Sequence, residues 1–319
     1  MLLRMCLIFV LLLAYRQRLS SVFVMKVSLG RKLVMNQNKK LGLITVLYNS
    51  PEILDDFFFS LSCQNFKNFH LYVIDNSNIP GPLFKSKQLA EKYSIPVTFI
   101  NNLGNNVGVA KGNNQGAFAA IEDGCEYLGF INNDLIFIEP QVIGFLHESL
   151  QHYDLVTPKI YSYPDGDVWF EEGYFDLERG STPHALINKT KHSIPYAPTC
   201  FLFCKVAVFK TCGMMDEWYF AYYDDSDFVY RAMSASFKLG FIKNVTIQHK
   251  VSTSTGGSYS DFSLYYGTRN RIYFIRKNLK TLRPLVFTLL SRVIVLPKIK
   301  VKQYSVLLRA MIDGLRAKV

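Results

Sequence analysis

Short apolar runs alternate with amphipathic stretches from residue 41 onward, and this pattern predicts alternating strands and helices. Residues 41–49 are apolar and β-branched and end in Tyr-Asn-Ser-Pro, which predicts a strand followed by a chain break. Similar runs at 69–75, 97–101 and 127–132 predict three more strands. The predicted helices start at Ser50-Pro51-Glu52, cover residues 82–93 and 108–122, and follow Pro140.

Four strand–helix units in series predict a Rossmann-like α/β fold, with a mostly parallel central sheet flanked by helices. In such sheets, ligands bind beyond the carboxyl ends of the strands. Polar residues lie at or just past all four of these ends, at Asn49, Asp75, Asn101 and Asp134. The sequence therefore predicts one binding site at this edge of the sheet.

The alternation breaks after residue 153. Residues 161–198 are rich in glycine and proline, which predicts irregular or antiparallel structure that forms part of a second substrate pocket. Residues 199–208 are predicted to be a strand that runs into a short helix. A helix is predicted over 224–239, ended by Gly240, and a last strand over 241–249. From residue 261 the pattern is helical.

The charge of the chain is distributed unevenly. Of the net +11, residues 1–40 contribute +8 and residues 276–319 contribute +10, which leaves −7 for residues 41–275. The acidic middle argues against a nucleic-acid-binding face, so no nucleic-acid partner is expected. Basic ends favour contact with an anionic membrane surface, where each exposed Lys or Arg contributes on the order of 1 kcal/mol. Basic tails that only solubilise an acidic domain are the alternative.

These patterns divide the chain into three segments. Residues 1–40 form a basic, apolar extension whose run Leu7–Leu13 is shorter than the roughly 20 residues of a spanning helix. This extension is either a weak membrane anchor or lies upstream of the true start. Residues 41–280 form the α/β domain. Residues 281–319 combine apolar and basic side chains, which predicts amphipathic helices that lie in a membrane interface or pack on the domain.

The six cysteines form no C-x-x-C pair and no zinc-type cluster with histidine. Cys200, Cys204 and Cys212 lie in apolar surroundings, so we expect small core residues. Unpaired cysteines of this kind fit a reducing compartment.

Two acidic residues at predicted strand ends are candidates for ligand binding. Asp134 follows a strand, with Asn132 beside it, and a carboxylate there suits Mn²⁺ or Mg²⁺, which prefer oxygen ligands and keep substrate phosphates. Asp75 ends another strand, where its carboxylate can accept the ring N–H of uracil or thymine. A polar turn at Asn132–Asp134 and a cap at Asp75 are the structural alternatives.

Residues 101–116 are unusually rich in asparagine and glycine. Amide side chains and Lys111 near a helix start suit ribose and phosphate. The stretch is not G-x-G-x-x-G and follows the third strand, which disfavours a dinucleotide dehydrogenase. Glycines at four-residue spacing also suit close packing of a helix on the sheet, which is the alternative.

A second acidic cluster, Asp224-Asp225-Ser226-Asp227, opens a predicted helix. Paired carboxylates raise one another's pKa, which suits a general base. Acids are also favoured at a helix N-terminus by the dipole, so simple capping is the alternative. His249 ends the last predicted strand and is either a ligand or a structural histidine.

Taken together, residues 41–276 resemble the inverting glycosyltransferases of family 2, which have the GT-A fold. Within that family they are most similar to the bacterial rhamnosyltransferase and galactofuranosyltransferase branch. The resemblance lies in eight motifs that follow in the family's order. They are Thr45-Val-Leu-Tyr-Asn49, Val73-Ile-Asp-Asn-Ser77, Asn106-Val-Gly-Val-Ala-Lys-Gly-Asn-Asn-Gln-Gly116, Asn132-Asn-Asp134, Gly213-Met-Met-Asp-Glu217, Tyr222-Tyr-Asp-Asp-Ser-Asp-Phe228 with Arg231, His249, and Arg269-Asn-Arg271.

The resemblance implies roles on the donor side of the site. Asp75 would bind the pyrimidine, and three further residues would line the nucleotide site. These are Asn106, Lys111 and Asn114. Asp134 would be the chief ligand of Mn²⁺ or Mg²⁺, with His249 as a further ligand and Asn132 where the family often has an acid.

On the acceptor side, the resemblance implies that Asp225 is the base that deprotonates the acceptor hydroxyl, and that Asp216, Glu217 and Trp218 face the acceptor. The implied activity is transfer of a sugar from dTDP-rhamnose or a UDP-sugar such as UDP-galactofuranose to a lipid-linked glycan. It implies a peripheral enzyme of polysaccharide synthesis at the cytoplasmic face of the cell membrane. A catalytically inactive protein that binds nucleotide sugars is the alternative.

Overall fold

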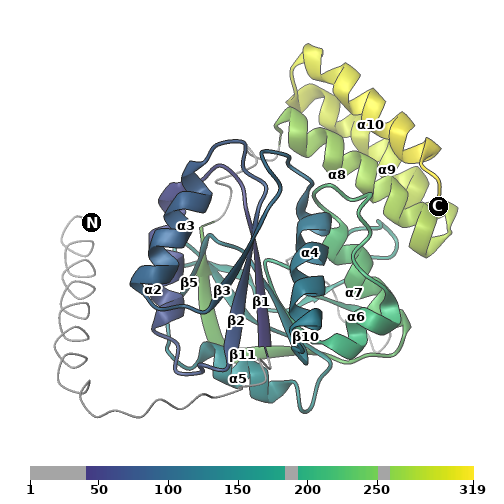
Figure 1. Cartoon of the computed structure of the whole chain (residues 1–319). Coiled ribbons are helices and arrows are strands. Elements are labelled where there is room, and N and C mark those ends of the chain that lie inside the picture. Colours follow the sequence, from purple (N-terminus) through teal and green to yellow (C-terminus); the bar gives the residue numbers. More distant parts are fainter. Residues whose placement is uncertain (1–40, 184–192, 251–258) are drawn as a thin grey trace, which may run out of the picture. The chain divides into compact units, whose positions relative to one another are not determined.

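A mixed sheet forms the centre of the computed structural model, which describes residues 41–183, 193–250 and 259–319. The predicted extension 1–40 lies outside the described residues. The strand order is β3-β2-β1-β4-β10-β6-β11-β5, with β7 beside β6 (Figure 1). The strands are β1 (Leu41–Leu47), β2 (Phe69–Asp75), β3 (Val97–Asn101), β4 (Tyr127–Ile131), β5 (Leu135–Phe137), β6 (Leu155–Ser162), β7 (Val168–Phe170), β10 (Phe201–Lys205) and β11 (Leu239–His249). A separate pair joins β8 (Gly173–Tyr174) to β9 (Pro195–Tyr196).

The helices match the predicted alternation in the first half of the chain. Pro51–Ile53 forms a 3₁₀ turn before α2, and Ile275–Leu279 forms a π-helical segment after α8. The α-helices are α2 (Leu54–Ser62), α3 (Gly81–Lys92), α4 (Val109–Glu122), α5 (Val142–Ser149), α6 (Val206–Cys212), α7 (Asp224–Ser234), α8 (Asp261–Phe274), α9 (Leu282–Val295) and α10 (Tyr304–Arg316). Figure 1 shows α2 and α3 on one side of the sheet and α4 on the other.

Strands β1 to β4 confirm the predicted parallel arrangement. Strand β1 pairs in parallel with both β2 and β4, and β2 pairs in parallel with β3. The register places Asp75 opposite Asn101. The carboxyl ends of these strands therefore meet at one edge, as the alternating pattern requires.

The second half of the sheet is mixed. Strand β10 runs antiparallel to β4 and β6, β11 runs parallel to β6, and β5 runs antiparallel to β11. The short strands β7, β8 and β9 fit the predicted antiparallel structure over 161–198.

Helix α4 packs closely on the sheet because of its glycines. A Cβ on Gly116 would lie 2.5 Å from Ile44 and 2.7 Å from Ile74, and a Cβ on Gly112 would lie 2.9 Å from Val46. These distances are too short for real contacts, so the helix can reach this position only with glycine at both sites. The packing alternative therefore accounts for these two glycines.

Helix α7 ends earlier than predicted. The prediction that it extends to Leu239 and ends at Gly240 is wrong, because both residues belong to β11. Ser236 adopts φ 67°, and the N–H of Phe237 donates to the carbonyl of Ala232 at 3.2 Å. This left-handed residue closes the helix with a Schellman-type turn, although serine gives no glycine-like signal in the sequence.

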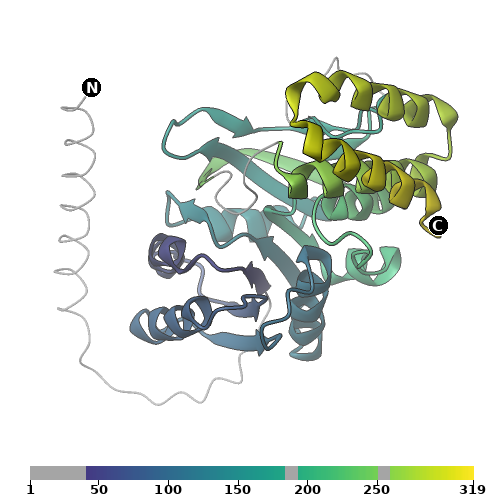
Figure 2. The same cartoon turned by 90° about the horizontal axis from the view of Figure 1, so that it is seen from above.

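The three C-terminal helices lie side by side in both views (Figures 1 and 2), and α10 packs on α8. The buried residues of α10 are Leu307, Ala310 and Gly314, which share one face. Within the described ranges, no helix combines the length and the apolar character needed to cross a bilayer.

Candidate active site

A pocket of about 360 Å³ opens at the carboxyl ends of β2 and β3. Asp75 lines it and is 3% exposed, and its Oδ1 accepts a hydrogen bond from the N–H of Ser77 at 3.0 Å. Phe84 and Leu103 line the same pocket and are largely exposed. A buried carboxylate between apolar side chains can bind a flat heterocycle with an N–H donor, so the geometry suits the predicted pyrimidine site.

The next two predicted nucleotide residues lie at the start of α4. Asn106 Oδ1 accepts from the N–H of Gly108 at 3.0 Å, so it shapes the turn that begins the helix. Gly108 adopts φ 86°, and a Cβ there would lie 2.6 Å from the carbonyl oxygen of Phe220. Lys111 lies in the first turn of α4 and pairs with Glu217 at 3.6 Å. The helix start is therefore joined to the loop that carries the predicted acceptor residues.

Asn114 makes the strongest connection to that loop. Its Oδ1 accepts from the N–H of Met215 at 3.0 Å, and its Nδ2 donates to the carbonyl of Met215 at 2.9 Å. Nδ2 also lies 3.2 Å from a carboxylate oxygen of Glu217. Asn114 is 1% exposed, and its hydrogen bonds in this structure are to protein groups.

Asp134 and His249 lie together at the end of β11. His249 Nε2 is 3.1 Å from Asp134 Oδ1, and both residues are buried. No hydrogen bond joins these two atoms, and Asp134 Oδ1 and His249 Nδ1 are buried polar atoms without a hydrogen-bond partner. The rings of Trp169 and His249 pack edge to face, with their centroids 4.9 Å apart. Orphaned buried acceptors are costly, so this pair suits a cation.

A carboxylate and an imidazole fit Mn²⁺ or Mg²⁺ only if other ligands complete the shell. Among the residues that the structure describes, no group of three His, Cys, Asp or Glu side chains could hold a metal alone. Asn132 lies in the turn between β4 and β5, and its N–H donates to the carbonyl of Cys200 at 2.8 Å. Donor phosphates and water would have to supply the remaining oxygens.

Asp225 lies in the first turn of α7. Its Oδ1 accepts from the N–H of Ser226 at 2.6 Å, and its Oδ2 accepts from the hydroxyl of Tyr196 at 2.5 Å. Asp224 is 4% exposed, and its Oδ2 is buried without a partner. Burial and then the charge of Asp225 raise the pKa of Asp224 to about 8. The acidic pair therefore divides into a fixed carboxylate and a neighbour that favours its protonated form.

Cys200 shows that the two acidic centres lie in one region. Burial raises the pKa of its thiol, and the nearby charges of Asp134 and Asp225 raise that pKa further. Both carboxylates therefore lie within electrostatic reach of the same side chain. The roles predicted for the two carboxylates, metal ligand for Asp134 and base for Asp225, stay predictions.

The predicted acceptor residues form a rigid loop before α7. Asp216 Oδ1 accepts from the N–H of Trp218 at 2.9 Å, and its Oδ2 accepts from Tyr273 at 3.0 Å. Lys277 pairs with Asp216 at 2.7 Å. Although partial burial opposes ionisation, the hydrogen bond from Lys277 lowers the pKa of Asp216. Trp218 packs on Tyr273 with ring centroids 4.2 Å apart.

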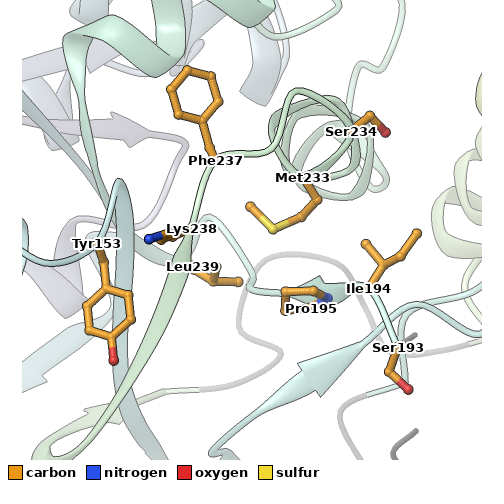
Figure 3. Close-up of a pocket in the computed structure, with 9 residues that line it drawn as sticks. All are labelled: Tyr153, Ser193, Ile194, Pro195, Met233, Ser234, Phe237, Lys238 and Leu239. Atoms are coloured by element: carbon orange, nitrogen blue, oxygen red, sulfur yellow. The ribbon is translucent and has the colours of Figure 1, made fainter. Parts of the chain in front are cut away.

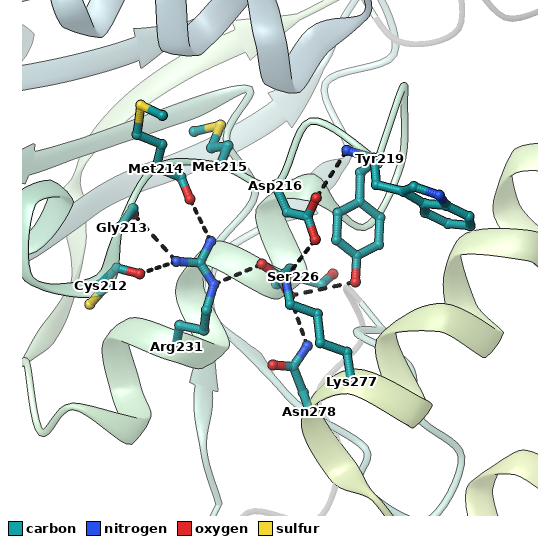
Figure 4. A network of polar contacts seen from close by, with 12 residues as sticks. Cys212, Gly213, Met214, Met215, Asp216, Tyr219, Ser226, Arg231, Lys277 and Asn278 are labelled. Carbon is teal, nitrogen blue, oxygen red and sulfur yellow. Dashed lines mark hydrogen bonds and ion pairs between the residues drawn. The ribbon is translucent and has the colours of Figure 1, made fainter. Parts of the chain in front are cut away.

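A network of ion pairs and hydrogen bonds contacts this loop (Figure 4). Asp227 is fully buried and accepts from Arg231 Nε at 2.8 Å and from Asn278 Nδ2 at 2.8 Å. Lys277 pairs with it at 2.9 Å. Arg231 also donates to the carbonyl of Met214 at 2.8 Å. Asp227 is therefore a structural acid, although it belongs to the same motif as Asp225.

A second pocket, of about 480 Å³, lies between the C-terminal end of α7 and the first residues of β11 (Figure 3). Met233, Phe237 and Leu239 line it. It is at the opposite ends of α7 and β11 from Asp225 and His249, so it is not part of the same site.

Several residues that the sequence analysis did not single out as site residues shape the site. Tyr196 bonds to Asp225, while Arg269 and Lys277 hold the loop around Trp218 and Asp216. Arg269 belongs to the motif Arg269-Asn-Arg271, to which the sequence assigned no role. Tyr196 and Lys277 lie outside the motifs, and only the fold brings them to the site.

The chain is similar to known proteins in sequence and in fold. The sequence profile described as "Glycosyl transferase family 2" matches residues 43–213. The chain is 25% identical over 239 residues to the low-salt glycan biosynthesis hexosyltransferase Agl10 of Haloferax volcanii, covering 72% of this chain and 74% of that protein. It is 24% identical over 298 residues to the dTDP-rhamnosyl transferase RfbF of Shigella flexneri, covering 88% and 96%.

Solved structures share the fold at low sequence identity. Residues 1–349 of S. aureus TarS in complex with UDP-GlcNAc match with a TM-score of 0.60 and 18% identity, covering 87% of this chain and 81% of that chain. The longer TarS structure is covered to 40%. The mannosyltransferase PcManGT from Pyrobaculum calidifontis, in complex with GDP-Man and Mn²⁺, matches with a TM-score of 0.55 and 10% identity, covering 88% and 76%.

Proposed function

Because the chain belongs to glycosyl transferase family 2, we propose that it transfers a sugar with inversion from a nucleoside diphosphate sugar to a hydroxyl of a lipid-linked glycan. The proposed donor is dTDP-rhamnose or a UDP-sugar such as UDP-galactofuranose. The name of the RfbF relative supports the first, and the carboxylate in the β2–β3 pocket suits either pyrimidine. The observation that carries the proposal is that Asp134, which pairs with His249, and Asp225 both lie near Cys200, whose carbonyl accepts from the N–H of Asn132.

Asp225 is the proposed general base. The acceptor oxygen attacks the anomeric carbon, the bond from that carbon to the diphosphate oxygen breaks, and the hydroxyl proton passes to Asp225. One displacement inverts the configuration, so no nucleophilic side chain is needed. The hydrogen bonds from the Tyr196 hydroxyl and from the N–H and hydroxyl of Ser226 fix the orientation of the carboxylate.

Asp134 and His249 are the residues that would hold a divalent cation, since the carboxylate and the imidazole meet at 3.1 Å and the carboxylate oxygen there makes no hydrogen bond. A bound Mn²⁺ or Mg²⁺ would supply positive charge next to the diphosphate. The structures of PcManGT and GalNAc-T7 with Mn²⁺ support a metal in proteins of this fold.

A donor screen tests the proposal. The full chain is incubated with UDP- and dTDP-sugars, Mn²⁺ and an alkyl glycoside acceptor, and release of nucleoside diphosphate is measured. Asp225→Asn should abolish release while keeping donor affinity, and the control Glu178→Gln, at an exposed ion pair, should change neither. No release by the unaltered chain with any of these donors would overturn the proposal. Donor binding without release would instead favour the inactive binding protein.

We also propose that α9 lies on the cytoplasmic face of the cell membrane as a peripheral anchor. Five apolar residues of α9 are between 51% and 76% exposed, namely Leu282, Val286, Leu290, Val293 and Ile294. Their spacing of four, four, three and one residues puts them on one helical face. The buried residues of α9 are Pro284 and Thr288, so this stripe does not pack on the domain.

Basic residues accompany the stripe, which favours an anionic lipid surface over a protein partner. Lys298, Lys300 and Lys302 follow α9 directly. Such a position would place the site near a lipid-linked acceptor.

Vesicle sedimentation tests this anchor. The unaltered chain should bind phosphatidylglycerol vesicles and not neutral phosphatidylcholine vesicles. Leu290→Asp should weaken binding on the order of tenfold or more, whereas Phe118→Asp, at an exposed apolar residue of α4, should not. Concentration-dependent dimerisation that Leu290→Asp removes would show that a second copy covers the stripe.

A further inference from the structure

Two consecutive tyrosines adopt left-handed backbone conformations directly before the acidic pair. Tyr222 has φ 65° and Tyr223 has φ 66°. Residues with a Cβ rarely adopt this conformation, and two in a row persist only where the surroundings hold them. The peptide units of these tyrosines set the direction in which α7 begins, and Asp225 is the second residue of that helix.

The side chain of Asn270, on α8, is hydrogen-bonded to this turn. Its Nδ2 donates to the carbonyl of Ala221 at 2.7 Å and to the carbonyl of Tyr222 at 2.9 Å. Asn270 is fully buried, so water cannot replace these bonds. The two carbonyls belong to the peptide units on either side of Tyr222. The hydrogen bonds from Asn270 therefore fix the orientation of both units.

Arg269 fixes the orientation of the Asn270 amide. Its Nε donates to Asn270 Oδ1 at 2.8 Å, which turns both N–H bonds of the amide toward the two carbonyls. The guanidinium also donates to the carbonyl of Trp218 at 2.8 Å and stacks on the Trp218 ring at 3.9 Å. A further bond joins the hydroxyl of Tyr222 to Ser263 at 3.0 Å. Helix α8 therefore contacts the turn through Ser263 and Asn270.

We propose that Asn270 is a positioning residue for the transfer reaction: it holds the Tyr222–Tyr223 turn strained so that α7 presents Asp225 to the acceptor. The inference rests on the proposed function of Asp225. An amide suits this site, because its NH2 group offers two N–H donors from one atom without placing a charge in the buried turn. Aspartate has the same shape but would place a carboxylate against two carbonyl oxygens.

The test compares Asn270→Asp and Asn270→Ala with the control Thr268→Val. Thr268 is equally buried on α8, but its hydroxyl bonds to Arg292 and not to the turn. Both Asn270 variants should lower kcat on the order of 30-fold, while the donor KM stays within about twofold, because the donor contacts lie elsewhere. Thr268→Val should leave kcat within about twofold. Should Asn270→Asp fail to fold, Asn270→Ser tests the same point without adding a charge.

A rescue experiment separates positioning from general support of the fold. Glycine adopts φ 65° without strain, so Tyr222→Gly should restore part of the kcat lost in Asn270→Ala, although it removes further side-chain contacts. Unchanged kcat in Asn270→Ala, or an equal loss in Thr268→Val, would overturn the inference.

Hydrogen exchange keeps this inference separate from the proposed function. Amides of residues 218–227 should exchange faster in Asn270→Ala than in the unaltered chain and in Thr268→Val. If the unaltered chain turned over no donor, the proposed function would fail while the exchange still reported on the turn. If turnover were normal and exchange unchanged in Asn270→Ala, the positioning role alone would fail.

Discussion

Replacing Lys277 with methionine tests whether the buried ion network carries the loop before α7. Lys277 Nζ lies 2.7 Å from Asp216 and 2.9 Å from Asp227. Asp227 is fully buried, while Lys277 and Asp216 are each roughly one-quarter exposed. Methionine keeps most of the aliphatic stem and removes the charge, so the change isolates the two ion pairs.

The expected loss in the free energy of unfolding depends on which carboxylate loses its partner. Breaking a buried ion pair from one side costs about 3–5 kcal/mol, because the remaining charge is left without water. Asp227 keeps Arg231 and Asn278, so the lower end applies. The partly exposed bond to Asp216 adds about 1 kcal/mol at most. We expect Lys277→Met to reduce the free energy of unfolding by about 3 kcal/mol.

Urea unfolding measures this change through the midpoint at constant m-value. The control Arg283→Met breaks the pair with Glu178 at 3.1 Å, where both side chains are at least 69% exposed. That change should cost less than about 1 kcal/mol. In an Asp227→Asn background, Lys277→Met should also reduce the free energy of unfolding much less, since no buried carboxylate is left there without its partner. A loss below about 1 kcal/mol in the single variant, or an equal loss in Arg283→Met, would refute the reasoning.

Three further predictions concern the site. Asp134→Ala and His249→Ala should each weaken Mn²⁺ binding, measured by calorimetric titration without substrate, on the order of tenfold or more; unchanged affinity in both would place the ion elsewhere. Because the folded-state pKa of Asp224 is about 8, far above its unfolded value, folding takes up a proton and the contribution of Asp224 to stability falls as pH rises from about 4 to about 8. Asp224→Asn should therefore gain stability relative to the unaltered chain across that range, as urea midpoints at several pH values would show, and a gap that narrows with pH would contradict it. Gly108→Ala should lower the melting temperature and raise the donor KM, since the added Cβ would lie 2.6 Å from the Phe220 carbonyl at φ 86°; an unchanged KM would separate this turn from donor binding.

The first half of the fold could be predicted because its apolar runs and its turn residues indicate the same strands. Each of β1 to β4 is a short apolar run bounded by a turn, and the observed bounds of β2 and β3 are the predicted ones. Strand β6 was not predicted, and Pro158 lies within it, a residue that argues against a central strand. The sheet accommodates Pro158 beside Ile242 of β11, where the register shifts. Such an accommodation depends on the partner strand and leaves no mark in the local pattern.

The residues of the candidate site likewise fall into two groups, those that could be predicted from the sequence and those that could not. Residues at strand ends and helix starts, such as Asp75, Asp134 and Asp225, could be predicted because local chemistry and topology both indicate this edge of the sheet. Contacts across the fold could not. Tyr196 reaches Asp225 from a two-residue strand whose bounds the glycine- and proline-rich pattern over 161–198 does not give. Lys277 appears in the sequence as one of many C-terminal basic residues.

The C-terminal segment contributes more to the site than its composition suggests. The basic charge of residues 276–319 was interpreted as a membrane signal, yet Lys277 is used inside the fold, where it neutralises Asp216 and Asp227. Asn270 acts from the same layer of helices, and α9 exposes its apolar stripe on another part of that layer. If lipid binds the stripe, the helices that contact the membrane are continuous with those that hold the loop before α7. Truncation before α8 should therefore remove the support of Asp225 along with the anchor, so a shortened chain that loses activity cannot be taken as evidence for a membrane requirement. Leu290→Asp, which leaves the packed faces intact, is the variant that separates the two roles.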